Sequence, residues 1–303
     1  MSFELTILGS GAAIPALHRR TTAQYVNCHQ RHILIDCGEG TQLQLRKFHI
    51  KFQQIDYILI SHLHGDHVFG LPGLISTMQM LGRTSKLKIF GPKGIKELVK
   101  TQLTLVGHHD LFALHFTEFE KNSAGCIYED KCITIHHFPL NHRVQTHGYL
   151  IKEKPHKRRL IKEAFEATGV RVSYIQKLIQ GEDITDNDGK HVRSDDVTIA
   201  GRPAKSYAYC SDTAFFPEIV PHIKDVDVLY HEATFIDKES ERAHTTYHST
   251  AKQAATIALK ANAKRLIMGH FSARYRSTKE HIEEASTIFT PCFAAEDGEL
   301  YKI

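Results

Sequence analysis

Short apolar runs alternate with longer amphipathic segments along most of the 303-residue chain. The apolar runs, rich in β-branched and aromatic residues, predict strands at 3–8, 22–27, 32–36, 56–60, 86–90, 112–119, 132–138, 147–152, 206–209, 226–230, 265–268 and 299–302. The amphipathic segments predict helices at 41–49, 67–82 (interrupted near Pro72), 92–105, 251–261 and 278–289. Strands that alternate with helices predict an α/β protein built in layers.

Local signals place the starts of two helices. Pro92 suits the first turn of helix 92–105, where its missing N–H is not needed. Ser249 or Thr250 suits the N-cap of helix 251–261, because a hydroxyl there can accept a hydrogen bond from a free backbone N–H.

Residues 152–205 break the pattern, because they are polar and are interrupted by glycine and proline. Within them, 152–162 holds six lysines and arginines against one acid, Glu153, and part of it, around 158–167, predicts a short helix. We interpret 152–205 as a basic insertion that protrudes from a single domain spanning 1–303. The alternative is a solvated surface helix with no binding role.

Composition and charge narrow the class of protein. The formal net charge of +4 and pI near 8.6 are mildly basic, which is compatible with an anionic partner. No apolar run approaches the ~18 residues of a membrane span, and the first residues lack a signal-peptide pattern. We therefore expect a soluble, cytoplasmic protein with no membrane partner. The six cysteines form no Cys-x-x-Cys pair, which argues against a cysteine zinc site or a dithiol redox centre.

The strand predicted at 56–60 is followed at once by His62, His64, Asp66 and His67. In an extended segment residues two apart point to the same side, so His62 and His64 can bind one ion. Gly65 lets the chain turn, and Asp66 and His67 can then face a second ion. Imidazole and carboxylate groups suit zinc. The alternative is a set of surface histidines on a turn.

Further candidate ligands follow other predicted strands: His142, Asp212 and His270. Seven ligands are too many for one tetrahedral zinc, but they fit two ions. In this hypothesis His62, His64 and His142 hold the first ion, Asp66, His67 and His270 hold the second, and Asp212 bridges them. Paired ions can clamp the oxygens of an in-line displacement, and zinc lowers the pKa of its water to about 7.

The chain resembles the metallo-β-lactamase superfamily in this ligand set and its order. Within the superfamily it is most similar to the ribonuclease Z family, over nearly its full length, in the segments LGSGAAIP (8–15), IDCGEG (35–40), SHLHGDH (61–67), GLPGL (70–74), CSDT (210–213), HEATF (231–235), HST (248–250) and GHFS (269–272). The resemblance implies a four-layer αβ/βα sandwich of the metallo-β-lactamase type with two Zn²⁺ between its sheets, for which Mn²⁺ or Mg²⁺ can substitute.

The resemblance also implies roles for individual residues. Asp66 becomes a proton acceptor as well as a ligand, and His248 assists the departure of the 3′ oxygen; the alternative for His248 is packing against a helix start. Glu232 either orients a ligand histidine or is only a carboxylate at a strand end.

The family's arm, which grips the elbow of transfer RNA, corresponds to the insertion at 152–205. Its candidate contacts to the RNA backbone are Lys157, Arg158 and Arg159. The Gly-Pro stretch that often marks the tip of the arm is absent, and 170–174 stands in its place. Homodimers are expected from the same resemblance.

The sequence thus predicts a zinc-dependent endoribonuclease that removes the 3′ trailer of precursor transfer RNA and leaves a 3′ hydroxyl. One rival is another hydrolase of the superfamily, acting on a thioester, a lactam or a small phosphodiester. A second rival is a non-catalytic RNA-binding or metal-storage protein.

Overall fold

The computed structural model describes residues 2–107 and 112–303. The contacts within the chain divide it into two compact units. The larger unit consists of Met1–Lys152 and Lys205–Ile303, and the smaller unit is the segment between these two ranges, Glu153–Ala204.

Two seven-stranded sheets form the larger unit. The first has the order β20 (Leu300–Lys302), β1 (Phe3–Gly9), β3 (Ala23–Cys28), β4 (Arg31–Ile35), β5 (Tyr57–Leu59), β6 (Leu87–Pro92) and β7 (Leu114–Phe119). The second has the order β19 (Cys292–Ala294), β17 (Leu266–Gly269), β16 (Val228–Glu232), β15 (Ser206–Cys210), β10 (His147–Glu153), β9 (Ile133–Pro139) and β8 (Gly125–Glu129). A short parallel ladder pairs β2 (Gly11–Ala12) with β18 (Phe271–Ser272).

Alternating side chains build the core between the two sheets. Ile33 and Ile35 of β4 lie in one buried cluster with Tyr149, Tyr207 and other residues of the second sheet. Successive residues of a strand point to opposite faces. Leu34 accordingly belongs to a different cluster, on the outer face of the first sheet.

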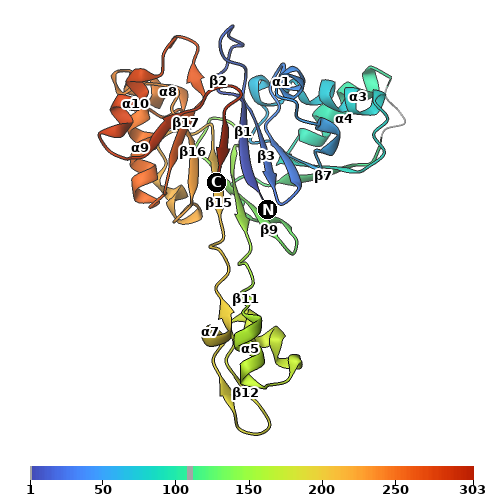
Figure 1. The fold of residues 1–303 in the computed structure, drawn as a ribbon. Helices are drawn as coiled ribbons and strands as arrows, with labels where there is room; N and C mark the ends of the chain where they lie inside the picture. The colour runs from blue at the N-terminus through green and yellow to red at the C-terminus, as the bar shows by residue number, and fades with distance from the viewer. Residues whose placement is uncertain (1, 108–111) are drawn as a thin grey trace. The chain divides into compact units, whose positions relative to one another are not determined.

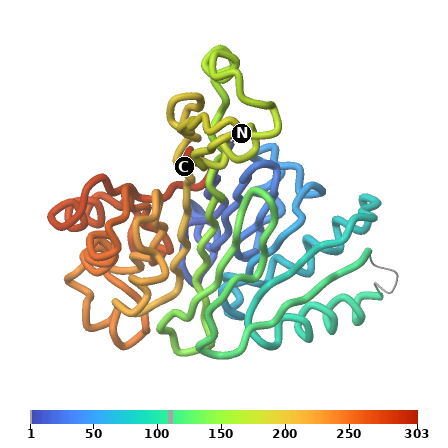
Figure 2. The backbone as a smooth tube through the Cα atoms, turned by 90° about the horizontal axis from the view of Figure 1, so that it is seen from below, coloured from blue at the N-terminus to red at the C-terminus, as the bar shows by residue number. Residues whose placement is uncertain are grey.

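Helices cover both outer faces, which gives four layers (Figures 1 and 2). On the first sheet they are α1 (Thr41–Lys47), α2 (Gly65–Val68), α3 (Leu71–Met80) and α4 (Ile95–Leu105). On the second sheet are α9 (Ala251–Lys260) and α10 (Lys279–Ser286), preceded in the chain by α8 (Ser240–Thr246). Among the described residues of this unit there are also three 3₁₀ turns, η1 (Phe52–Gln54), η3 (Pro217–His222) and η4 (Asp237–Glu239). The predicted four-layer sandwich is confirmed.

The start predicted for helix 92–105 is wrong. Pro92 is the last residue of β6, and α4 begins only at Ile95, after Gly94 in a left-handed conformation. Proline is tolerated at a strand end as well as at a helix start, so the residue alone does not separate the two. The break in 67–82 falls between α2 and α3, just before Pro72, which sits in the first turn of α3.

The N-cap predicted before α9 is confirmed. Thr250 accepts a hydrogen bond from the backbone N–H of Gln253, and the Gln253 side chain accepts one from the N–H of Thr250. This capping box fixes the entry to α9, directly after His248.

The smaller unit, Glu153–Ala204, has a hydrophobic cluster of its own, which includes Phe165, Leu178 and Val192. Its elements are β11 (Arg159–Leu160), α5 (Lys162–Thr168), η2 (Val172–Tyr174), α6 (Ile175–Gln180), β12 (Ile184–Thr185), β13 (His191–Val192), α7 (Ser194–Val197) and β14 (Thr198–Ile199). The helix predicted around 158–167 therefore begins later, because Arg159 and Leu160 pair with Ile199 and Thr198 in a ladder.

All six cysteines lie among the described residues, and none of them forms a disulfide. Within residues 2–107 and 112–303, no helix is long and apolar enough to cross a membrane.

Candidate metal centre

The predicted ligands follow the ends of strands in both sheets of the larger unit. His62 and His64 follow β5, and Asp66 and His67 lie in the short helix α2. The loop after β4 holds α2 in place: the N–H of Cys37 donates to the carbonyl of His67 at 2.8 Å. Gly38 is needed for this approach, because a Cβ there would lie 2.2 Å from the carbonyl oxygen of Asp66.

One group of ligand atoms comes from His62, His64, His142 and Asp212, whose candidate donors all lie within 4.8 Å of one another. Nε2 of His62 lies 2.9 Å from Nδ1 of His64 and 3.7 Å from Oδ2 of Asp212. The ring of His142 lies 5.4 Å from that of His62.

The second group comes from Asp66, His67 and His270. Nε2 of His67 and Nε2 of His270 lie 3.3 Å apart, and each lies 3.5 Å from Oδ2 of Asp66. Oδ1 of Asp212 is 3.4 Å from Nε2 of His67 and 3.1 Å from Nε2 of His270. The two Asp212 oxygens thus face different groups, as a bridging carboxylate requires.

The side chains behind the ligands fix which ring nitrogens point inward. Nδ1 of His67 donates to Oδ2 of Asp36 at 2.7 Å, and the Tyr209 hydroxyl donates to the same oxygen at 2.6 Å. Thr234 Oγ1 lies 3.0 Å from Nδ1 of His270. In each case the hydrogen bond to Nδ1 leaves Nε2 free to bind a metal.

These supporting roles were not predicted, because they depend on contacts between segments far apart in the chain. The sequence signal was that Asp36 ends one predicted strand and Thr234 follows another. Asp36 and His270 moreover have φ angles of 57° and 56°, a left-handed conformation that is uncommon outside glycine.

Burial keeps the histidines of the first group uncharged. It lowers the pKa of His62 well below its ordinary value, and the neighbouring His67 lowers it further. It also lowers the pKa of His64 and of His142. These rings are therefore neutral, which is the form in which imidazole binds a metal.

In the second group, attraction between opposite charges outweighs burial in setting the pKa values. Burial alone would raise the pKa of the Asp66 and Asp212 carboxyls, but His67 and His270 outweigh it and hold both pKa values below the ordinary range. Burial would lower the pKa of His67, but Asp212, Asp66 and Asp36 raise it well above its usual value. Three carboxylates thus surround His67, and their negative charge favours its protonated ring. A divalent cation bound at this place would neutralise that negative charge instead.

The donors fit divalent metal ions. Nδ1 of His142 donates to the carbonyl of Tyr247 at 2.9 Å, and its buried Nε2 has no hydrogen-bond partner among the described residues. A buried nitrogen without a partner is costly unless something binds there. Imidazole nitrogens and carboxylate oxygens are the ligands that zinc takes in catalytic sites.

His248 lies beside the ligands, with its ring 5.4 Å from that of His270. Its Nδ1 donates to Oε1 of Glu232 at 2.9 Å. Burial would lower the pKa of His248, but the Glu232 carboxylate raises it to about 9, so the ring is protonated at neutral pH. The bond to Nδ1 leaves Nε2 as the nitrogen that can give up a proton.

Glu232 is fully buried and accepts hydrogen bonds from several groups. Oε1 also accepts from the N–H of Thr213 at 2.7 Å, and Oε2 accepts from the hydroxyl of Thr234 at 2.6 Å. The sequence left two roles open for Glu232: to orient a ligand histidine, or to be only a carboxylate at a strand end. Neither describes it fully. It bonds directly to His248, and its hydrogen-bond link to the candidate ligand His270 runs through Thr234.

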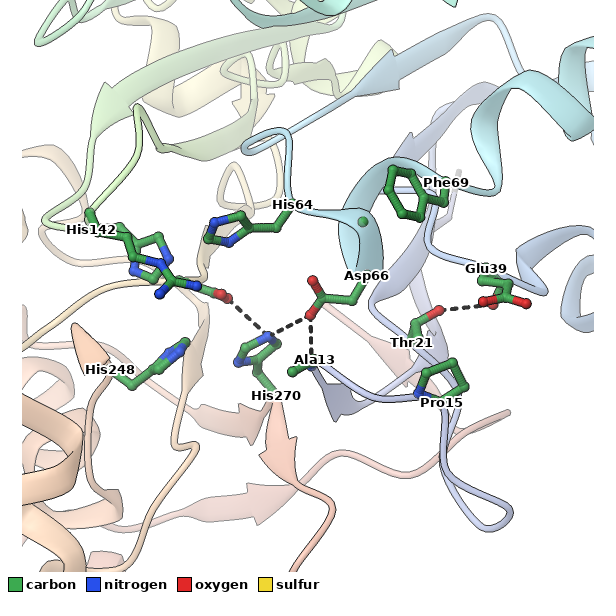
Figure 3. A pocket seen from close by; sticks show the side chains of 13 residues that line it. Ala13, Pro15, Thr21, Glu39, His64, Asp66, Phe69, His142, His248 and His270 are labelled. Carbon is green, nitrogen blue, oxygen red and sulfur yellow. Dashed lines mark hydrogen bonds and ion pairs between the residues drawn. The ribbon is translucent and has the colours of Figure 1, made fainter. Parts of the chain in front are cut away.

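An open cavity of about 420 Å³ lies over these groups. Figure 3 shows His64, Asp66, His142, His248 and His270 pointing into it from different segments. The N–H of Ala13 donates to Oδ2 of Asp66 at 2.7 Å and fixes this carboxylate at the cavity wall. The cavity therefore brings candidate ligands, a carboxylate and a protonated histidine to one place.

The three basic residues predicted to bind substrate lie in the smaller unit. Lys157 and Arg159 are exposed, whereas Arg158 is partly buried. The Arg158 guanidinium donates to Thr198 at 2.6 Å and pairs with Asp195. Lys157 and Arg159 are thus presented to solvent, and Arg158 also stabilises this unit.

Comparison with known proteins identifies the family. Over 98% of its length the chain is 43% identical to ribonuclease Z of Bacteroides fragilis, of which 97% is covered. The chain belongs to the ribonuclease Z family. Residues 191–271 match the family model of the beta-lactamase superfamily domain, and residues 3–154 match that of anti-Pycsar protein Apyc1.

Solved structures agree with this assignment. The chain is 26% identical to human tRNase Z, short form, with a TM-score of 0.70 and 98% of each chain covered. The metallo-beta-lactamase fold protein YhfI of Bacillus subtilis has a TM-score of 0.71 over the whole of both chains at 17% identity, which supports the fold alone. The resemblance predicted from the sequence is confirmed, and this member of the ribonuclease Z family has the metallo-β-lactamase fold.

Proposed function

We propose that this protein is a metal-dependent endoribonuclease that removes the 3′ trailer of precursor transfer RNA and leaves a 3′ hydroxyl on the transfer RNA. One observation carries the proposal: His248, whose Nδ1 donates to Glu232 at 2.9 Å, faces the same cavity as five of the seven candidate ligands, namely His64, Asp66, His142, Asp212 and His270. The relatives named ribonuclease Z and tRNase Z supply the substrate class.

Two ions, zinc in the first instance, would be held by the two ligand groups. His62, His64 and His142 would hold one, Asp66, His67 and His270 the other, and Asp212 would bridge them. Such a pair supplies Lewis acidity: it makes water nucleophilic at neutral pH and stabilises the charge that develops on phosphoryl oxygens.

In this proposal Asp66 accepts a proton from the attacking water. Its pKa lies below the ordinary range, so the carboxylate is ionised, and the N–H of Ala13 holds Oδ2 in position. A carboxyl group must be ionised to take up a proton as a general base.

In this proposal His248 protonates the leaving 3′ oxygen. Its pKa of about 9 keeps Nε2 protonated at pH 7, and Glu232 stabilises the imidazolium before the proton is transferred. The bond between phosphorus and O3′ breaks in this step. The proton from His248 lets O3′ leave as a hydroxyl group.

The inserted unit is proposed to bind the RNA backbone, through Lys157 and Arg159 above all, with Arg158 contributing. Their charge suits phosphate groups, and each phosphate contact releases counterions. Glu153–Ala204 as a whole carries ten lysines and arginines against nine acids, so the positive charge is local to its first residues. This unit thereby supplies affinity and not catalysis.

The protein is further proposed to act as a homodimer in the cytoplasm. Large apolar side chains are exposed at the C-terminal ends of α3 and α4, among them Met80 and Leu105, which are 70% and 81% exposed. A second copy could cover such surface. The cytoplasmic location is proposed from the substrate class; six cysteines without a disulfide also suit a reducing compartment.

A comparison of substrates tests this function against the rival hydrolases of the superfamily. Purified protein is assayed on a precursor transfer RNA, bis(p-nitrophenyl) phosphate, a thioester and a β-lactam. The proposal predicts efficient cleavage of the RNA, slow hydrolysis of the small phosphodiester and none of the thioester or lactam. Faster turnover of the thioester or lactam than of the RNA would contradict it.

A further inference from the structure

The loop formed by residues 10–20, which contains β2 and leads into β3, reaches the candidate metal centre through the backbone of Ala13. The N–H of Ala13 donates to Oδ2 of Asp66 at 2.7 Å (Figure 3). The same Oδ2 faces the second ligand group, since it lies 3.5 Å from Nε2 of His67 and 3.5 Å from Nε2 of His270. A group that fixes this loop therefore also fixes the orientation of a candidate ligand.

A carboxylate far along the chain holds both ends of the loop. Oδ1 of Asp297 accepts from the backbone N–H of Ser10 at 3.0 Å and from the Ser10 hydroxyl at 2.9 Å. Oδ2 of Asp297 accepts from the N–H of Arg20 at 2.7 Å. Next to this carboxylate the N–H of Gly11 donates to the carbonyl of Arg20 at 2.9 Å. Ser10 and Arg20 are thus held together as the two ends of a closed loop, with Ala13 inside it.

The turn that carries Asp297 is itself fixed in place. It joins β19 of the second sheet to β20 of the first. The N–H of Gly298 donates to the carbonyl of Ile7 at 2.7 Å, which ties the turn to β1. Gly298 has a φ angle of 97°, a left-handed conformation that glycine adopts without strain. Asp297 is therefore presented to the loop from a rigid position at the edge of the first sheet.

Two further contacts support the loop from another side. The N–H of Phe271 donates to the carbonyl of Ser10 at 2.9 Å, beside the ladder of β2 and β18. The guanidinium of Arg19 donates to the carbonyl of Tyr275 at 2.7 Å. Both contacts attach the loop to the segment that follows His270. They remain when Asp297 is substituted, so we expect the loop to shift and not to unfold.

We propose that Asp297 is a positioning residue for the candidate metal ligand Asp66, because its carboxylate sets the loop so that the N–H of Ala13 meets Oδ2 of Asp66. This role rests on the proposed metal centre, and it involves no contact of Asp297 with metal or RNA. Two acceptor oxygens are needed to take the N–H groups of Ser10 and Arg20 at once. An amide in this place would turn its NH₂ group toward one of these donors.

Release of Zn²⁺ from the loaded protein tests the role of Asp297. Zn²⁺-loaded protein is titrated with a chromophoric chelator, and the ions retained per chain are measured for wild type, Asp297→Asn and Glu296→Gln. Glu296→Gln is the matched control, since it makes the same change of carboxylate to amide at the preceding, exposed residue. We expect Asp297→Asn to lose Zn²⁺ at a chelator concentration roughly 10-fold lower than wild type, the lower end of the range for groups that support a metal ligand. Glu296→Gln should behave as wild type.

A double substitution separates positioning from a general loosening of the fold. In an Asp66→Ala background the N–H of Ala13 has no ligand to orient, so Asp297→Asn should add little further loss of Zn²⁺. Ser10→Ala removes one of the three hydrogen bonds to the Asp297 carboxylate and should give a smaller loss than Asp297→Asn. It is also the milder variant to use should Asp297→Asn not fold.

Two results would overturn the positioning role: Zn²⁺ retention in Asp297→Asn equal to that of wild type, or a further loss in the Asp66→Ala background as large as in the wild-type background. A wild-type protein that retains no Zn²⁺ on gel filtration would overturn the proposed metal centre itself, and the role of Asp297 with it.

Discussion

At the scale of single residues, the chain brings seven candidate ligands together from segments as distant as His62 and His270. The cluster at His62–His67 could be predicted from sequence because its members are neighbours in the chain. His142, Asp212 and His270 could be predicted because each follows a strand. Asp36 and Thr234 could not, because their contacts to His67 and His270 appear only when the chain is folded.

Asp212 is the residue on which a paired metal site most depends, because its two oxygens face different ligand groups. We predict two ions per chain in the wild type and a lower content in Asp212→Ala, with cleavage lost in parallel. Metal analysis after gel filtration measures both. Asp225→Ala, at an exposed carboxylate outside the site, is the control. A wild type with one ion, or a variant that retains two, would refute the bridging role.

His248 is predicted to contribute to the chemical step and not to metal binding. His248→Ala should keep its metal content and most of its RNA affinity, while single-turnover cleavage falls about 10²- to 10⁴-fold, the usual range for general acid–base catalysis. Glu232→Gln should show part of the same loss, because it removes the charge that stabilises the imidazolium. Cleavage by His248→Ala within a few-fold of wild type would instead favour a packing role against α9.

At the scale of elements, the strands and most helices of the sandwich were predictable from their apolar runs. β8, β19 and α8 were missed, because they are short and partly exposed and so carry little periodicity. The start of α4 was misplaced because Pro92 suits either a strand end or a helix start.

The packing of α10 predicts a pH dependence of stability. His281 of this helix is fully buried, edge-on to Phe271 and Tyr275, and burial, with Arg19, lowers its pKa to about 4. In the unfolded chain this ring takes up a proton near pH 6.5, whereas in the folded chain it does so only near pH 4. Protons therefore favour unfolding as pH falls through this window.

His281→Phe should remove this contribution. We predict that the free energy of unfolding falls less between pH 7.5 and 5.5 in the variant than in the wild type, by about 1 kcal/mol. Urea unfolding in the presence of chelator measures it, and His115→Phe, at an exposed position of β7, should keep the wild-type dependence. Equal slopes for wild type and His281→Phe would show that His281 is already protonated when buried.

At the scale of the whole molecule, the sequence placed the inserted segment at 152–205, and the structure has a separate compact unit at Glu153–Ala204. Its presence was predictable from composition and charge. Its internal fold was not, because its core of six buried apolar residues is spread over short, mostly polar elements.

Deleting this unit should separate RNA binding from chemistry. Lys152 pairs with Ser206 across β10 and β15, so a short Gly-Ser bridge in place of 153–204 can close these antiparallel strands as a hairpin. We predict that the deletion keeps most hydrolysis of bis(p-nitrophenyl) phosphate and severely weakens cleavage of precursor transfer RNA. Equal loss on both substrates would indicate a folding role, and no loss on the RNA would exclude a binding role.

Charge reversal makes the same test without removing the unit. Lys157→Glu with Arg159→Glu should weaken RNA binding and reduce the slope of log affinity against log salt by roughly 0.7–0.9 per lost contact. Arg158 is left intact, because it also pairs with Asp195. Lys260→Glu, at the exposed end of α9, is the matched control and should leave the slope unchanged.

The central claim is metal-dependent cleavage at the 3′ end of transfer RNA, and mapping the cut tests it most directly. Purified protein is incubated with a 5′-labelled precursor transfer RNA, with and without chelator, and the labelled product is sized and its terminus examined by periodate oxidation. The account predicts one cut on the 3′ side of the acceptor stem, a periodate-sensitive 3′ hydroxyl on the product, no cut with chelator, and recovery when zinc is restored. Undiminished cleavage in chelator, a 3′ phosphate, or cuts scattered along the RNA would contradict it.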